Sequence, residues 1–139
     1  MKILMSDIFL TYQPSFKGNE TILLLCDNQT IAWLIQQFEQ FAGFVLGDGK
    51  PVGSDGLYIV IAEPHGEVTC SRITQERTNY FRWVISPDSA NRYRSLLLAM
   101  LETDKPCHQY LDADDNISPV VMISRGEYEI EAFKTQGQV

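Results

Sequence analysis

Short hydrophobic runs separated by turn-forming residues dominate the first part of the chain. Residues 3–12 are rich in apolar and β-favouring side chains and end at Gln13-Pro14-Ser15, which predicts a first strand. Lys17-Gly18-Asn19 then precedes the apolar run of residues 21–26, a second predicted strand. Because so few residues separate them, the two strands are expected to form a hairpin.

The pattern then changes to helical spacing. Apolar residues recur three or four positions apart, so they share one face of a helix. These positions are Ile31, Leu34, Ile35, Phe38, Phe41 and Ala42. Asp27 and Asn28 offer capping side chains before the segment, and Gly43 is placed to end it. The sequence therefore predicts a first helix between these signals.

Strand patterns return after a glycine-rich stretch. Residues 57–62 form a short apolar run suited to a buried strand. Residues 68–73 and 78–85 predict a hairpin, since a short polar break separates two β-favouring segments. One face of the later strand carries Phe81, Trp83 and Ile85.

A second helix is predicted to begin at Ser86-Pro87-Asp88. The serine can cap the first amides, proline suits the first turn, and the acid meets the positive end of the helix dipole. The apolar stripe of this helix is Tyr93, Leu96, Leu97, Met100 and Leu101. Residues 107–111 and 119–124 then read as strands around an acidic turn.

The predicted order is ββαβββαββ. It indicates an α+β fold with one mixed or antiparallel sheet of about six to seven strands and two helices packed against it. We find no internal repeat and no linker, and 139 residues is an ordinary length for one domain. We therefore expect a single α+β domain over residues 1–139.

The composition, with 45% hydrophobic and 21% charged residues, is typical of a globular protein. The start of the chain does not resemble a signal peptide, and no apolar run is long enough for a membrane helix. Cys26, Cys70 and Cys107 are odd in number and widely spaced, which disfavours a secreted disulfide framework. These features predict a protein of a reducing cytoplasm.

The negative charge is concentrated near the C-terminus. The formal net charge is −7, and residues 102–131 contain eight acids against two bases, a local charge of −6. The acids are Glu102, Asp104, Asp112, Asp114, Asp115, Glu127, Glu129 and Glu131. Residues 68–94, by contrast, carry five arginines against two acids, a local +3. An acidic chain disfavours nucleic-acid binding and favours capture of a basic protein.

Known phosphate and metal motifs are incomplete. The glycines of residues 47–50 follow a helix and precede a strand, which is the wrong context for a phosphate-binding loop. Asp112, Asp114 and Asn116 match the start of a calcium loop, but Ile117 stands where that loop requires glycine. We expect no metal and no cofactor.

Two rival functions remain open. His65 or His108 could act as acid or base in a small hydrolase or nuclease, or pair with Cys107 as base and nucleophile. A pair of Cys107 and His108 is disfavoured, because neighbouring residues of a strand point to opposite faces. The central arginines could instead support a small-ligand-binding module.

One tract resembles a known class of protein. Lys105-Pro106-Cys107-His108-Gln109-Tyr110-Leu111-Asp112 and Val120-Val121-Met122-Ile123-Ser124-Arg125-Gly126-Glu127-Tyr128 are similar to the C-terminal end of small bacterial immunity proteins. Such proteins are encoded beside polymorphic or contact-dependent growth-inhibition toxins and neutralise them in the cytoplasm by binding.

The resemblance implies a non-enzymatic inhibitor whose partner is a toxin domain. The acidic tract predicts that this domain is basic, while the charge and the short apolar runs predict neither nucleic acid nor membrane as partner. The predicted partner-binding residues are Asp112, Asp114, Asp115, Glu127 and Glu129. The residues of the tract could equally be structural, with Gln109 and Tyr110 tying a strand to the sheet and Ser124, Gly126 and Glu127 building its terminal turn.

Overall fold

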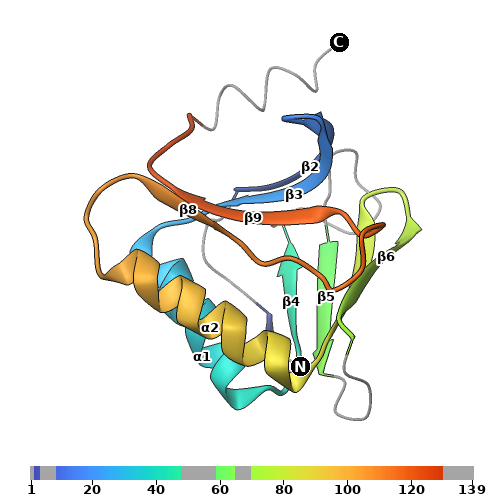
Figure 1. Ribbon diagram of the computed structural model, residues 1–139, viewed down its shortest axis with the longest axis horizontal. Helices are drawn as coiled ribbons and strands as arrows, with labels where there is room; N and C mark the ends of the chain where they lie inside the picture. Colours follow the sequence, from blue (N-terminus) through green and yellow to red (C-terminus); the bar gives the residue numbers. More distant parts are fainter. Residues whose placement is uncertain (1, 4–8, 48–58, 65–69, 130–139) are drawn as a thin grey trace.

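A computed structural model describes residues 2–3, 9–47, 59–64 and 70–129, and these form two helices and two mixed sheets (Figure 1). The five-stranded sheet A has the order β1-β4-β5-β7-β6, and the four-stranded sheet B has the order β2-β3-β9-β8. The elements are β1 (Lys2–Ile3), β2 (Phe9–Phe16), β3 (Asn19–Leu25), α1 (Asn28–Gln40), β4 (Phe44–Gly47), β5 (Ile59–Pro64), β6 (Arg72–Arg77), β7 (Tyr80–Ile85), α2 (Pro87–Leu101), β8 (Cys107–Tyr110) and β9 (Val120–Arg125).

The predicted α+β class is confirmed, with differences in the sheets. The short strand β4 was not predicted, and the strands divide between two sheets instead of one. The segment predicted as one strand over residues 3–12 contributes β1 to sheet A and β2 to sheet B, with residues 4–8 outside the described part. The predicted strand over residues 57–62 is β5, shifted toward Pro64, and its first two residues are likewise outside the described part.

Strand β2 continues through Pro14 to Phe16, beyond its predicted end. Its register against β3 shifts between Gln13 and Phe16. Because β2 lies at the edge of sheet B, the missing proline N–H removes no bond to a second neighbouring strand. The predicted hairpin between the first two long strands is confirmed, since β2 and β3 pair antiparallel.

Both helices begin at the predicted caps. The Asp27 side chain accepts a hydrogen bond from the Thr30 amide at 2.8 Å, and the Ser86 side chain accepts one from the Ser89 amide at 3.2 Å. Helix α1 ends at Gln40, where Phe41 takes a left-handed conformation with φ of 52°. The predicted stop, Gly43, also has a positive φ but lies two residues further on.

One hydrophobic core joins the two sheets and the two helices, which lie side by side (Figure 1). The Phe38 ring packs edge-on against the rings of Phe44, Trp83 and Tyr93, with centroids 5.4, 6.1 and 5.5 Å away. The predicted inward face of β7 is confirmed, since Phe81, Trp83 and Ile85 are all buried. Within the described residues, neither helix combines the length and the apolar composition needed to cross a bilayer.

The middle of β3 is buried on both faces of sheet B, which explains the unbroken apolar run of this strand. Ile22 and Leu24 belong to the main core, while Leu23 points to the opposite face and packs with Met122 of β9. We call this opposite face the outer face of sheet B. Phe9, Phe16, Leu25 and Tyr128 are partly buried around it.

Candidate functional site

An acidic loop, residues 111–119, connects β8 to β9 and lies against the edge strand of sheet A. The Asp114 amide donates to the Ser71 carbonyl at 2.8 Å, and the Ser71 amide donates to the Asp114 carboxylate at 2.6 Å. Ser71 immediately precedes β6, so this pair of bonds joins the loop to the start of the edge strand. The acidic loop therefore connects the two sheets.

A second pair of bonds fastens the end of the acidic loop. The Ile73 amide donates to the Ser118 hydroxyl at 2.9 Å, and that hydroxyl donates to the Ile73 carbonyl at 3.3 Å. Within the loop, the Ser118 amide donates to the Asp115 carboxylate at 2.9 Å. Asp115 therefore stabilises the turn itself.

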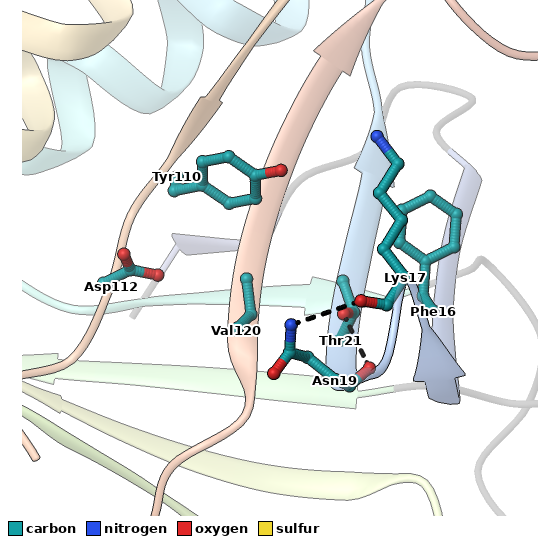
Figure 2. A pocket seen from close by; sticks show the side chains of 7 residues that line it. All are labelled: Phe16, Lys17, Asn19, Thr21, Tyr110, Asp112 and Val120. Carbon is teal, nitrogen blue, oxygen red and sulfur yellow. Dashed lines mark hydrogen bonds between the residues drawn. The ribbon is translucent and has the colours of Figure 1, made fainter. Parts of the chain in front are cut away.

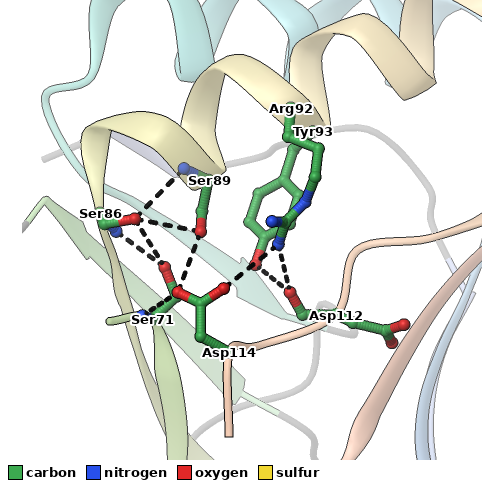
Figure 3. A network of polar contacts seen from close by, with 7 residues as sticks. All are labelled: Ser71, Ser86, Ser89, Arg92, Tyr93, Asp112 and Asp114. Atoms are coloured by element: carbon green, nitrogen blue, oxygen red, sulfur yellow. Dashed lines mark hydrogen bonds and ion pairs between the residues drawn. The ribbon is translucent and has the colours of Figure 1, made fainter. Parts of the chain in front are cut away.

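The start of the loop is held by α2 (Figure 3). The Tyr93 hydroxyl and the Arg92 guanidinium donate to the Asp112 carbonyl at 2.7 and 2.9 Å. Arg92 also lies 3.6 Å from the Asp114 carboxylate, which accepts a bond from the Ser89 hydroxyl at 3.4 Å. The hydroxyls of Ser71, Ser86 and Ser89 complete the network around the start of α2, where all three serines are buried.

The Asp112 side chain points away from this network, as Figure 3 shows, and lines a depression on the outer face of sheet B (Figure 2). This sheet B depression has a volume of about 210 Å³ and is lined by Phe16, Lys17, Asn19, Thr21, Tyr110, Asp112 and Val120. Desolvation raises the pKa of Asp112, and the Arg92 charge opposes the shift. The depression lies beside both stems of the acidic loop, because Asp112 and Val120 are near its two ends.

Lys17 occupies the other side of the depression. Its ammonium lies 5.6 Å from the centroid of the Phe16 ring and 5.8 Å from that of the Tyr128 ring. The pKa of Lys17 is raised, chiefly by the Tyr128 hydroxyl, with smaller contributions from Tyr110 and Glu127. Lys17 therefore places a positive charge on the side of the depression opposite Asp112.

Glu127 follows β9 and binds two side chains. Its carboxylate oxygens lie 2.9 and 3.0 Å from His108 Nδ1, and one of them accepts a bond from the Ser124 hydroxyl at 2.8 Å. The acid thus stands between the serine and the histidine, whereas a catalytic triad needs the histidine in the middle. Burial opposes ionisation of Glu127, but the bonds from His108 and Ser124 outweigh it and lower the pKa of the carboxyl.

The lowered pKa of Glu127 predicts a contribution to stability that depends on pH. The ionised form is stabilised in the folded state, so its contribution is present above the usual pKa of 4.5 and is lost as the pH falls through the lower, folded value. We expect Glu127→Gln to lose less stability than the wild type between about pH 5 and pH 3 in urea unfolding. Glu102→Gln, at an exposed position, is the control. Parallel curves for wild type and Glu127→Gln would contradict the assignment.

The five predicted partner-binding residues occupy different environments. Asp112 lines the depression, whereas the carboxylates of Asp114, Asp115 and Glu127 accept bonds from Ser71, Ser118 and Ser124, respectively. Glu129 is exposed beyond β9. Asp114 is only partly solvated, since its side chain is only 27% exposed and lies 3.6 Å from Arg92.

The residues of the rival hypotheses do not converge in the described part of the chain. His65 lies outside the described residues, while Cys107 packs toward the core and its neighbour His108 bonds Glu127 on the outer side. Arg82 pairs with Glu63 and Glu76, and Arg92 belongs to the network at α2. Within the described residues, no three histidine, cysteine or acidic side chains are grouped so that they could hold a metal ion.

Three features of this region were not predicted from the sequence: the contribution of Lys17 and Phe16 from the distant β2 hairpin, the exposed ring of Tyr110, and the exposed Ile117. Only Ile117 carries a local signal, an apolar residue inside a polar turn. No known protein family, curated protein or solved structure gives a significant match to this chain.

Proposed function

We propose that this protein binds and neutralises a cognate bacterial toxin, as immunity proteins do, by occluding the toxin through an acidic surface. The observation that carries the proposal is the acidic loop, which is tied to two elements at its base while its tip is exposed. Binding then needs little further ordering of the loop, which lowers the entropic cost of association. Asp112 and Glu129 supply exposed negative charge, and Asp114 and Asp115 hold the loop in shape. Glu127 adds negative charge beside them while its carboxylate is bonded to His108 and Ser124.

The tip of the acidic loop adds an apolar contact. Ile117 is 82% exposed and is preceded by Asp115 and Asn116. Protein interfaces commonly combine a central apolar anchor with a polar rim. This arrangement suits a basic protein surface that contains a small apolar pocket, and the negative charge would accelerate the encounter.

Substitution of the anchor gives a direct prediction. Ile117→Ser is expected to weaken toxin binding about tenfold or more, because it removes the apolar contact from the centre of the interface. Leu98→Ser is the matched control, since Leu98 is 43% exposed on α2. Calorimetric titration with the partner measures both variants. Equal losses of affinity would mean that Ile117 is not the anchor.

The function itself is tested with the product of the gene next to this one. Co-expression of the two proteins should give a stable complex on co-purification, and this protein should restore growth to cells that produce the toxin. If the proteins neither co-purify nor protect cells, the proposal is overturned. If a hydrolytic rate is found instead and His108→Ala abolishes it with an unchanged circular dichroism spectrum, the enzyme alternative replaces it.

A further inference from the structure

We infer that the sheet B depression is a binding site for one arginine side chain of a protein partner, held between the Asp112 carboxylate and the Tyr110 ring. This inference rests on the proposed function, because it identifies the group that the toxin would insert beside the acidic loop. The charge pattern of the sequence indicated Asp112, but it did not indicate the depression that Asp112 lines or the ring of Tyr110 beside it.

The position of Asp112 is the first observation. Its carbonyl is fixed by Tyr93 and Arg92, so the backbone is held while the carboxylate points into the depression (Figures 2 and 3). No side-chain hydrogen bond or ion pair of this carboxylate is found within the described residues. An acid that lines a depression and makes no ion pair within the described residues is a ready partner for a charged side chain.

The ring of Tyr110 is the second observation. Tyr110 is 39% exposed and lines the same depression as Asp112, together with the apolar side chains of Phe16 and Val120. A guanidinium stacks on an aromatic face, and its methylene stem covers apolar surface. An acid beside an aromatic ring therefore fits arginine better than a neutral side chain.

Lys17 is not the cation that pairs with the Asp112 carboxylate. Its ammonium lies near the Phe16 and Tyr128 rings, and Figure 2 places it across Val120 from Asp112. Within the described residues, no ion pair joins Lys17 to Asp112. The negative side of the depression thus remains available to a cation from outside.

The size of the depression favours a side chain over a free metabolite. Pockets for small molecules usually measure roughly 300–1,000 Å³ and enclose most of the ligand. The present volume of about 210 Å³ is smaller, and the depression lies on a surface beside the loop that we propose for docking. One long side chain that enters from a bound protein matches this space.

The experiment uses the peptide acetyl-Gly-Arg-Gly-amide as a probe, titrated into the full-length protein and followed by nuclear magnetic resonance. We expect saturable shifts of the Tyr110, Asp112 and Val120 amides with a dissociation constant in the millimolar range. The peptide with citrulline in place of arginine has nearly the same shape without the charge, and it should bind about three- to tenfold more weakly.

Variants separate the two contacts. Asp112→Asn and Tyr110→Leu should each weaken binding of the arginine peptide about three- to tenfold, whereas Asp104→Asn, the same charge change at an exposed position outside the depression, should not. Lack of saturable shifts up to about 50 mM peptide, or equal binding of the citrulline peptide, overturns the inference.

The failure of this inference can be distinguished from failure of the proposed function. If the toxin is captured normally by Asp112→Asn and the peptide does not bind the wild type, the arginine site is wrong and the immunity function stands. If the peptide binds as expected but no toxin is captured, the site stands and the immunity function is wrong.

Discussion

Replacement of Asp114 by alanine is expected to lower the free energy of unfolding by about 2–3 kcal/mol. The carboxylate accepts bonds from the Ser71 amide and the Ser89 hydroxyl and lies 3.6 Å from Arg92. Its loss leaves the amide and the hydroxyl without their acceptor near the start of α2, where both serines are buried. Urea unfolding followed by circular dichroism measures the change.

The other acids of the loop provide the controls. Asp112→Ala should cost less than about 1 kcal/mol, because its side chain has no described partner in the fold. Asp115→Ala should be intermediate, at about 1 kcal/mol, since it removes one capping bond to Ser118. Equal costs for Asp112→Ala and Asp114→Ala would show that the network does not hold the loop. A variant that neutralises Asp112, Asp114 and Asp115 together therefore loses stability as well as charge, so its affinity must be corrected for the fraction of unfolded protein.

Replacement of Arg125 by methionine is expected to cost about 3 kcal/mol. The guanidinium donates to the carbonyls of Met100 and Thr103 at 2.8 and 2.6 Å, so it satisfies acceptors at the end of α2. It also donates to the Lys105 carbonyl at 2.9 Å and to the Asn28 side chain at 2.7 Å, at the start of α1. One side chain thus joins β9 to both helices.

Thermal unfolding offers a second measurement for Arg125→Met. A loss of 3 kcal/mol should lower the melting temperature by about 10 °C in a domain of this size. Arg125→Lys should recover little, because an ammonium cannot reach several acceptors in fixed directions. Arg82→Met, which removes a side chain that is 48% exposed and pairs with Glu63 and Glu76, should cost less than about 1 kcal/mol. A melting temperature of Arg125→Met close to that of Arg82→Met would rule out the proposed role.

The roles of Arg125 and its neighbours bear on the tract that resembles immunity proteins. Ser124 is buried and donates to Glu127, and Gly126 adopts a positive φ of 76° beside Pro106. Leu111 is buried as well, with 1% exposure. Much of the tract therefore builds the end of sheet B and its contact with α2, while Tyr110 and Asp112 remain exposed for recognition.

The local sequence determined the helices and most of the strands. Asp27 and Ser86 could be predicted as caps, because each is a short side chain with an oxygen atom that precedes a helical pattern. Such a side chain accepts a hydrogen bond from the first free amides of the helix, and this bond does not depend on how the helix packs in the fold. The inward face of β7 was likewise predictable, because side chains of a strand alternate between its two faces. These features depend on residues within a few positions of one another.

The pairing of strands was decided by the tertiary structure. The sequence does not show that β3 lies parallel to β9, almost a hundred residues away, nor that residues 3–12 serve two sheets. Such pairings depend on which apolar side chains of distant strands are buried together. Leu23 and Met122 form one buried cluster only once the chain has folded. Strand β4 could not be predicted for the same reason. It has only four residues, and their strand structure depends on pairing with adjacent strands of the sheet such as β5.

The same distinction applies to the candidate site. Charge counting identified the acidic tract, because net charge is a property of composition. Only the tertiary structure separated Asp112, which faces a depression built with Phe16 and Lys17, from Asp114, which bonds Ser71 from a different sheet. A buried or half-buried carboxylate needs hydrogen-bond donors, and one donor to Asp114, the Ser71 amide, lies 43 positions away in the sequence. A local sequence pattern contains no information about a contact at that separation.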